Sequence, residues 1–180
     1  VVNRFNSSPT FTNVTFESNF ADNGGGMSNG SGSNPILTDV IFRYNRVTYN
    51  AGGMANSSNS NPILTNVMFI ENGQLSPDDS GVFYGAGGGL YNYNSNPILT
   101  NVTFIDNFVS PGRGGGMYNN NSSPTLLNVT FFNNSAFSYY YYGSFGGGMY
   151  NEESSPTLTN VTFNSNLADE SGGGIYNYAS

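Results

Sequence analysis

One motif recurs six times along this chain, and it constrains the possible fold more than any other feature. Each copy reads approximately S/N-P-T/I-L-T-N-V-T-F-x-x-N, continues through a segment of variable length, and ends in G-G-M-Y-N. The copies are marked by Pro9, Pro35, Pro62, Pro97, Pro124 and Pro156, at spacings of 26, 27, 35, 27 and 32 residues. A unit of this length cannot bury an apolar face alone, so its regular repetition indicates that successive copies stack on one another.

Three positions of the repeat hold the same residue type in all six copies. They are a valine (Val14, Val40, Val67, Val102, Val129 and Val161), a phenylalanine (Phe16, Phe42, Phe69, Phe104, Phe131 and Phe163) and an asparagine (Asn19, Asn45, Asn72, Asn107, Asn134 and Asn166). Because side chains alternate between the two faces of a strand, the valine and the phenylalanine share the inner face. By the same alternation, the leucine of P-I-L-T and the residue after the glycine pair also face inward.

This pattern predicts an all-β fold, a right-handed parallel β-helix (β-solenoid) of six coils, with about 26–27 residues per coil. Longer insertions fall in coils 3 and 5, and residues 1–180 form one domain without obvious capping elements. Each coil contributes about three short strands separated by Asn or Gly corners. The invariant asparagines form a ladder in which each amide donates to one neighbour and accepts from the other. A β-propeller is the alternative architecture, but a single inward layer per 26–27 residues favours the solenoid.

The six F-x-x-N and six G-G-[M/L/I] motifs resemble the paired F-x-x-N and G-G-A-[I/L/V] repeats of the chlamydial polymorphic outer membrane proteins. The phrases S-P-T-L-T-N-V-T-F and G-G-G-M-Y-N are also similar to β-helix repeats of large secreted bacterial surface proteins. The resemblance covers the whole chain and implies a right-handed parallel β-helix with a surface, adhesive or scaffolding role. The sequence departs from that pattern after the glycine pair, where Met followed by Tyr is the usual choice.

Composition narrows the classes of function. The chain has four Arg and no Lys or His against eleven acidic residues, for a net charge of −7. No basic stripe is available for nucleic acid or for an anionic membrane surface, and no apolar run approaches the length of a membrane span, so we expect no membrane insertion. Charged residues make up only 8%. With the many small hydroxyl and amide side chains and ten Asn-x-Ser/Thr glycosylation candidates, this composition favours an extracellular or cell-surface location.

Catalysis has little support in the sequence. Enzymes that use this fold act mostly on polysaccharides and gather carboxylates or basic residues on one exposed strand face. Here the acidic residues scatter, and only Glu71 and Asp106 occupy equivalent positions on adjacent coils. We therefore expect a protein that is not an enzyme, with no catalytic residues, no metal ligands and no cofactor.

Aromatic residues form the candidate binding surface. The insertions fall between the invariant asparagine and the glycine pair, and the two longest are Gly73–Gly87 and Ser135–Gly146. They contain Phe83, Tyr84, Tyr139, Tyr140, Tyr141 and Tyr142, and an outward stripe adds Tyr91, Tyr118, Tyr150 and Tyr176. Such aromatic area suits glycans or a host or matrix protein. The alternatives are loops that only fold over the coil edge and a stripe whose rings stack on one another.

Outward threonines suggest a third surface function, ice binding. The columns are Thr12, Thr38, Thr65, Thr100 and Thr159, and Thr15, Thr103, Thr130 and Thr162. Flat threonine arrays suit ice, but Ile41, Met68 and Leu127 interrupt these columns, and threonine is an ordinary outward strand residue.

The first and last segments repeat the same element. Val1-Val2-Asn3 aligns with Met-Tyr-Asn of the repeat, and Ile175-Tyr176-Asn177 is that element again. Val1, Val2, Ile175 and Tyr176 are therefore candidate end contacts. Either the sequence is part of a longer β-helix, or identical copies stack head to tail. We predict an extracellular structural protein that stacks on itself into a surface filament or scaffold, and the alternative is an adhesin or glycan-binding segment of a larger surface protein.

Overall fold

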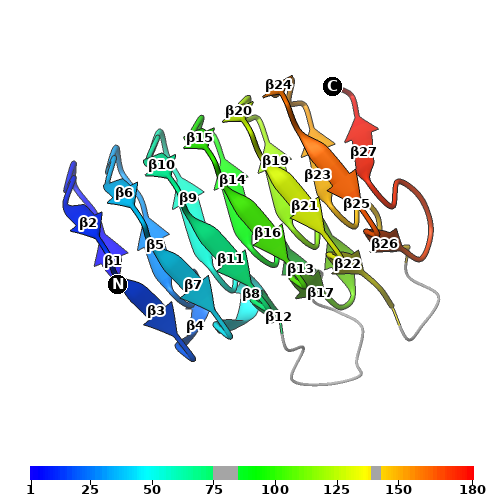
Figure 1. The fold of residues 1–180 in the computed structure, drawn as a ribbon, viewed down its shortest axis with the longest axis horizontal. Helices are drawn as coiled ribbons and strands as arrows, with labels where there is room; N and C mark the ends of the chain where they lie inside the picture. Colours follow the sequence, from blue (N-terminus) through cyan, green and yellow to red (C-terminus); the bar gives the residue numbers. More distant parts are fainter. Residues whose placement is uncertain (75–84, 139–142) are drawn as a thin grey trace.

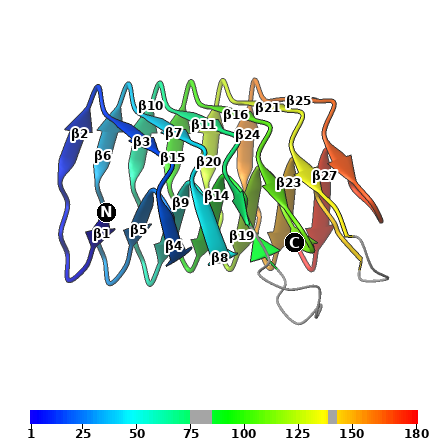
Figure 2. The same ribbon diagram turned by 90° about the horizontal axis from the view of Figure 1, so that it is seen from below.

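The computed structural model describes residues 1–74, 85–138 and 143–180, and these ranges form a rod of stacked coils (Figure 1). All named strand pairs are parallel, and the chain advances along the long axis from coil 1 to coil 6 (Figure 2). The predicted fold class, a right-handed parallel β-helix, is confirmed, because two of the sheets contain one strand from each of six coils.

Each coil contributes to four sheets, which we name faces 1 to 4 in the order that the chain visits them. Face 1 contains β2 (Thr10–Thr12), β6 (Ile36–Thr38), β10 (Ile63–Thr65), β15 (Ile98–Thr100), β20 (Thr125–Leu127) and β24 (Thr157–Thr159). Face 2 contains β3 (Thr15–Glu17), β7 (Ile41–Arg43), β11 (Met68–Ile70), β16 (Thr103–Ile105), β21 (Thr130–Phe132) and β25 (Thr162–Asn164). Coil 1 begins at β2 and coil 6 at β24.

Faces 3 and 4 complete the coil. Face 3 contains β4 (Phe20–Asn23), β8 (Arg46–Asn50), β12 (Gly73–Gln74), β13 (Gly85–Ala86), β17 (Phe108–Val109), β18 (Gly112–Arg113), β22 (Ser135–Ala136) and β26 (Leu167–Ala168). Face 4 contains β1 (Val2–Asn3), β5 (Met27–Asn29), β9 (Met54–Ser57), β14 (Leu90–Tyr93), β19 (Met117–Asn120), β23 (Met149–Glu152) and β27 (Ile175–Tyr178).

The expectation of about three strands per coil is wrong, because each coil also contributes to a fourth sheet, face 3. Face 3 forms from the segment of variable length between the invariant asparagine and the glycine pair. Its inward side chains, which include Val47, Gln74, Val109 and Ala136, are buried but share no common residue type. Without a repeated apolar phrase, the strand has no signature in the sequence.

The corners depend on left-handed backbone conformations. The turn from face 1 to face 2 places an Asn or Asp at positive φ in every coil: Asn13, Asp39, Asn66, Asn101, Asn128 and Asn160. Asn and Asp tolerate this region better than other residues with a side chain. The turn into face 4 uses Gly87 at φ 63° in coil 3, and Ala51 takes the same conformation at φ 57° in coil 2.

The core is built of columns of like side chains along the axis. The predicted inward phenylalanines stack ring on ring from Phe16 to Phe163, with centroids 4.7–5.0 Å apart. The valine, leucine and methionine columns pack against them and are fully buried in the middle coils. This regular stack makes each coil the template for the next one.

Two asparagine ladders run through the interior. In the predicted ladder from Asn19 to Asn166, each Nδ2 donates to the Oδ1 of the next coil over 2.8–3.0 Å. The second ladder, which the sequence analysis did not identify, runs from Asn3 to Asn177 on face 4 with the same direction and donor distances of 2.8–2.9 Å. Both ladders therefore give the rod a chemical polarity along its axis.

Candidate functional site

The tyrosine stripe forms a continuous column on the outer side of face 4. The strand register aligns Tyr91, Tyr118, Tyr150 and Tyr176 on successive coils. Their rings stack nearly parallel, with centroids 5.4, 5.4 and 5.2 Å apart. The expected stacking of the rings on one another is thus what the structure shows.

The two middle rings of this column are buried rather than displayed on an open platform. The apolar cluster around Tyr118 and Tyr150 includes Ala86 and Phe145, which reach the rings from the face 3 side. As a result Tyr118 is 7% exposed and Tyr150 is 3% exposed, although both point away from the solenoid core. Only Tyr91 and Tyr176, at the two ends of the column, are partly exposed.

A small polar cluster sits over the middle of the column. The hydroxyl of Tyr118 donates to Oε2 of Glu152, and Nη1 of Arg113 lies 3.7 Å from the same oxygen. The guanidinium of Arg113 also lies 5.2 Å from the ring centroid of Tyr150, within cation–π range. These contacts join face 3 of coil 4 to face 4 of coil 5, so the cluster forms only when the two coils stack.

Burial raises the pKa of three phenols in this column. Burial raises the pKa of Tyr91 above its ordinary value, and it does the same at Tyr150, where the charge of Arg113 partly offsets the rise. At Tyr118 burial is again the main cause of a raised pKa, and the hydrogen bond to Glu152 adds to it. The three hydroxyls can therefore act as hydrogen-bond donors over a wide pH range.

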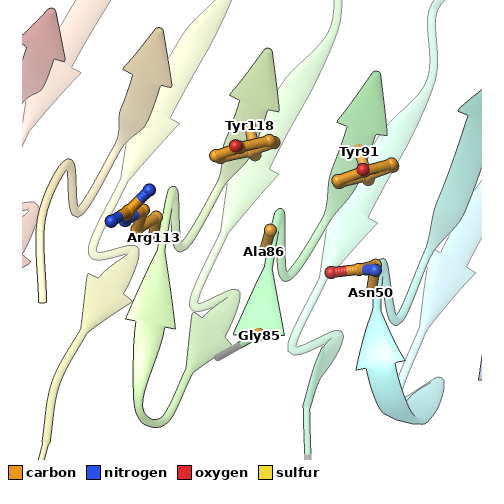
Figure 3. A pocket seen from close by; sticks show the side chains of 6 residues that line it. All are labelled: Asn50, Gly85, Ala86, Tyr91, Arg113 and Tyr118. Carbon is orange, nitrogen blue, oxygen red and sulfur yellow. The ribbon is translucent and has the colours of Figure 1, made fainter. Parts of the chain in front are cut away.

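A pocket of about 220 Å³ opens beside the column, between faces 3 and 4 (Figure 3). Its described lining consists of Asn50, Gly85, Ala86, Tyr91, Arg113 and Tyr118. Figure 3 shows the two tyrosines on neighbouring face 4 strands, with the Arg113 and Asn50 side chains on opposite flanks. The pocket thus combines aromatic rings with a guanidinium and an amide, a set suited to binding a polar ring.

A family model described as the right handed beta helix region matches residues 1–180. The chain belongs to the right-handed β-helix family. No curated protein and no solved structure matches it.

The predicted binding residues of this β-helix fall into two groups. Tyr91, Tyr118, Tyr150 and Tyr176 lie in the column described above. Phe83, Tyr84 and the run Tyr139–Tyr142 lie outside the described residues, so their role as a binding surface stays a prediction, as does the likeness to the chlamydial proteins.

The candidate end contacts lie in the outermost described strands of the β-helix. The amino group of Val1 donates to the carbonyl oxygen of Gly26 over 2.9 Å, and Val2 is 65% exposed on β1. Ile175 and Tyr176 lie on β27 and are partly buried. β1 pairs with β5 and β27 pairs with β23, so the four candidate residues lie at or beside the first and last strands of face 4.

Other sequence candidates lie on the outer surface of the β-helix. Thr12, Thr38, Thr65 and Thr100 align in one outward column, which Leu127 interrupts before Thr159. The second column runs from Thr15 through Ile41 and Met68 to Thr103, Thr130 and Thr162. Ice binding by these columns stays a prediction.

One pair of acidic residues in the β-helix lies on adjacent coils, as the sequence predicts. Glu71 and Asp106 occupy the same corner on neighbouring coils, and both have positive φ. Within residues 1–74, 85–138 and 143–180, no three His, Cys, Asp or Glu side chains are placed to hold a metal ion. Over the same ranges, the chain contains no helix long and apolar enough to cross a bilayer.

Sequence reasoning missed the polar half of the site. Arg113 and Glu152 each occur once at their positions in the repeat, and the asparagine at the position of Asn50 recurs only at Asn23, so no phrase common to the coils marks them. The one available signal was that Arg113 and Glu152 flank successive copies of G-G-M-Y-N, which stacking brings to neighbouring coils. The asparagine of G-G-M-Y-N, by contrast, recurs in every copy and could have identified the second ladder.

Proposed function

We propose that this β-helix is a non-enzymatic structural protein of the cell exterior, a rod whose copies stack end to end into a filament or scaffold. The observation that carries the proposal is the common direction of the two asparagine ladders. At the end of the rod that contains β1 and coil 1, their free ends are the Oδ1 atoms of Asn3 and Asn19, which are hydrogen-bond acceptors. At coil 6 the Nδ2 donor of Asn177 lies at the free end of its ladder. The two end surfaces are therefore complementary, and they favour head-to-tail contact.

Apolar residues support the same contact. Phe11, Val14 and Phe16 in coil 1 and Val161, Phe163 and Ile175 in coil 6 are only partly buried, although their equivalents in the middle coils are fully buried. A coil added to either surface would continue the core columns and pair the strand backbones, at ~0.5–1.5 kcal/mol for each hydrogen bond. Flanking coils of a longer polypeptide would satisfy the same groups, and the experiment below therefore tests whether separate copies do so.

Sedimentation velocity of the purified chain over a range of concentrations tests the proposal. The wild-type chain should form larger species as its concentration rises. Val161→Glu places a carboxylate in the apolar end layer, where it stays hydrated in the monomer but is buried in the joint, so assembly should be lost. The matched control is Thr162→Glu, whose side chain faces outward on face 2. Its assembly should match that of the wild type.

A second pair keeps the test informative if Val161→Glu does not fold by circular dichroism. Val14→Glu changes the opposite end surface, and Thr15→Glu is its outward control. A wild-type chain that remains monomeric at every concentration would overturn end-to-end stacking. Assembly that survives both Val161→Glu and Val14→Glu would place the contact elsewhere.

A second candidate function is glycan binding by a surface adhesin, and the pocket beside Tyr91 favours it. Shallow sites that combine aromatic rings with planar polar side chains suit sugar rings, which have an apolar face and a rim of hydroxyls. The described strands within the two long insertions, β12, β13 and β22, belong to face 3, and Gly85 and Ala86 of β13 line the pocket. This function and filament formation are compatible.

A further inference from the structure

The pocket lies over Ala86, which the register of face 3 places between Asn50 and Arg113, and beside the tyrosine column of face 4. The strand register places Ser28, Ala55 and Tyr91 at equivalent positions in coils 1, 2 and 3. Tyr118 stacks on one side of the Tyr91 ring, whereas the position on the other side holds only the methyl group of Ala55. Among the described residues, Tyr91 is therefore the end of the aromatic stack, and the pocket lies beside its last two rings, Tyr91 and Tyr118.

The size of the pocket limits what it can hold. Its volume of about 220 Å³ is below the ~300–1,000 Å³ of typical sites for drug-sized ligands, and it is open to solvent rather than enclosed. Such a space accommodates one six-membered ring of a longer molecule whose other units remain in solvent.

The polar groups match hydroxyls better than a fixed charge. Asn50 offers an amide on one flank of the pocket, and Arg113 offers several N–H donors on the other (Figure 3). The positive charge of Arg113 lies close to the carboxylate of Glu152, which balances it. The whole chain carries a net charge of −7, which disfavours the approach of an anionic polymer.

We propose that this pocket binds one pyranose ring of a neutral glycan, with the ring against Tyr91 and its hydroxyls bonded by Asn50 and Arg113. The proposal rests on the glycan-binding candidate function above and is independent of filament formation. It names the residues of the site and the class of sugar.

Affinity electrophoresis in native gels tests the proposal, at protein concentrations below any self-assembly. The probes are three neutral polysaccharides, hydroxyethylcellulose, galactomannan and mixed-linkage β-glucan, and one acidic one, polygalacturonate. At least one neutral polysaccharide should retard the wild-type chain. Tyr91→Ala should weaken that retardation at least tenfold, and it introduces the residue that Ala55 already provides one coil earlier. Tyr176→Ala, at the other end of the same column, is the matched control and should bind as the wild type does.

Each other outcome has a defined meaning. Wild-type retardation that Tyr91→Ala and Asn50→Ala both retain would overturn the pocket as the site while leaving glycan binding in place. No retardation by any neutral polysaccharide would overturn the pocket and the candidate function together. Retardation by polygalacturonate alone would overturn the choice of a neutral sugar. Asn50→Ala also serves as the second variant if Tyr91→Ala does not fold.

Discussion

At the scale of single residues, the buried asparagines show how a polar side chain stabilises this fold. Asn72 is fully buried, and its Oδ1 accepts hydrogen bonds from both the backbone N–H and the Nδ2 of Asn45. Its own Nδ2 donates to the carbonyl oxygen of Phe42 and to Oδ1 of Asn107. Because no water is needed to complete this network, an asparagine is more suitable here than an apolar residue of similar volume.

Replacing Asn72 with alanine should therefore destabilise the chain by about 3 kcal/mol or more. The substitution leaves buried groups of the two neighbouring coils without partners, at ~1–3 kcal/mol for each unsatisfied group. Guanidinium unfolding followed by circular dichroism measures the change. Asn164→Ala, at an exposed outward position of face 2, is the control and should change stability by less than ~0.5 kcal/mol. Equal effects of the two substitutions would contradict a stabilising role for the ladder.

The raised pKa of Tyr118 leads to a prediction about alkaline pH. Below the ordinary tyrosine pKa of 10.0, the folded and unfolded chains both keep the proton. As the pH rises from there towards the higher pKa of the folded chain, only the unfolded chain releases the proton, so the stability falls. Tyr118→Phe removes this contribution, and its unfolding midpoint should fall less steeply than that of the wild type between about pH 10 and pH 11. The same slope in both proteins would contradict the buried environment of this phenol.

At the scale of the elements, the turn from face 3 to face 4 brings the backbones of neighbouring coils close together. Gly88 has ordinary backbone angles, but a Cβ atom there would lie 2.5 Å from the carbonyl oxygens of both Phe108 and Gly115. Neither oxygen can move without disturbing the ladder of backbone hydrogen bonds between coils. The glycine pair is thus required by the distance between coils, in addition to the left-handed turn at Gly87.

Gly88→Ala should destabilise the chain by at least ~1 kcal/mol, because the added methyl group would lie too close to two backbone carbonyl oxygens. Gly30→Ala is the matched control, since the nearest atom to a Cβ there is Oγ of Ser57 at 3.5 Å. The control should be neutral or slightly stabilising, by less than ~1 kcal/mol. Thermal or guanidinium unfolding of both variants measures the difference, and a Gly88→Ala variant as stable as the control would refute the close approach.

Features of the fold could be predicted from the sequence where the same residue type recurs in every copy of the repeat, and not elsewhere. The coil number, the phenylalanine column and the ladder from Asn19 rest on residues that recur in all six copies, so their stacking followed from the repeat itself. Face 3 has no recurring residue type, and its strands were assigned to a loop. The pocket depends on Arg113 and Asn50, which come from coils 4 and 2. Their position holds Arg in one coil only and Asn in only two, Asn23 and Asn50, so only the three-dimensional register brings them to the tyrosines.

At the scale of the whole molecule, the rod is a directional object. Its core columns, its backbone pairs and its two asparagine ladders all continue from coil to coil without a change of direction. The ladders leave the Oδ1 acceptors of Asn3 and Asn19 at one end and the Nδ2 donor of Asn177 at the other, so the two end surfaces differ. Head-to-head or tail-to-tail contacts would set like groups against each other, whereas head-to-tail contacts repeat the bonding already present between coils.

Cryo-electron microscopy of the purified chain at several concentrations tests end-to-end assembly most directly. We predict fibres one solenoid wide that lengthen with concentration, with the ~4.8 Å strand spacing of the coils continuing across each joint. The tyrosine column should then repeat once per copy along the fibre. Discrete particles of one length at every concentration would contradict the account and leave the chain as a rod that does not assemble with itself.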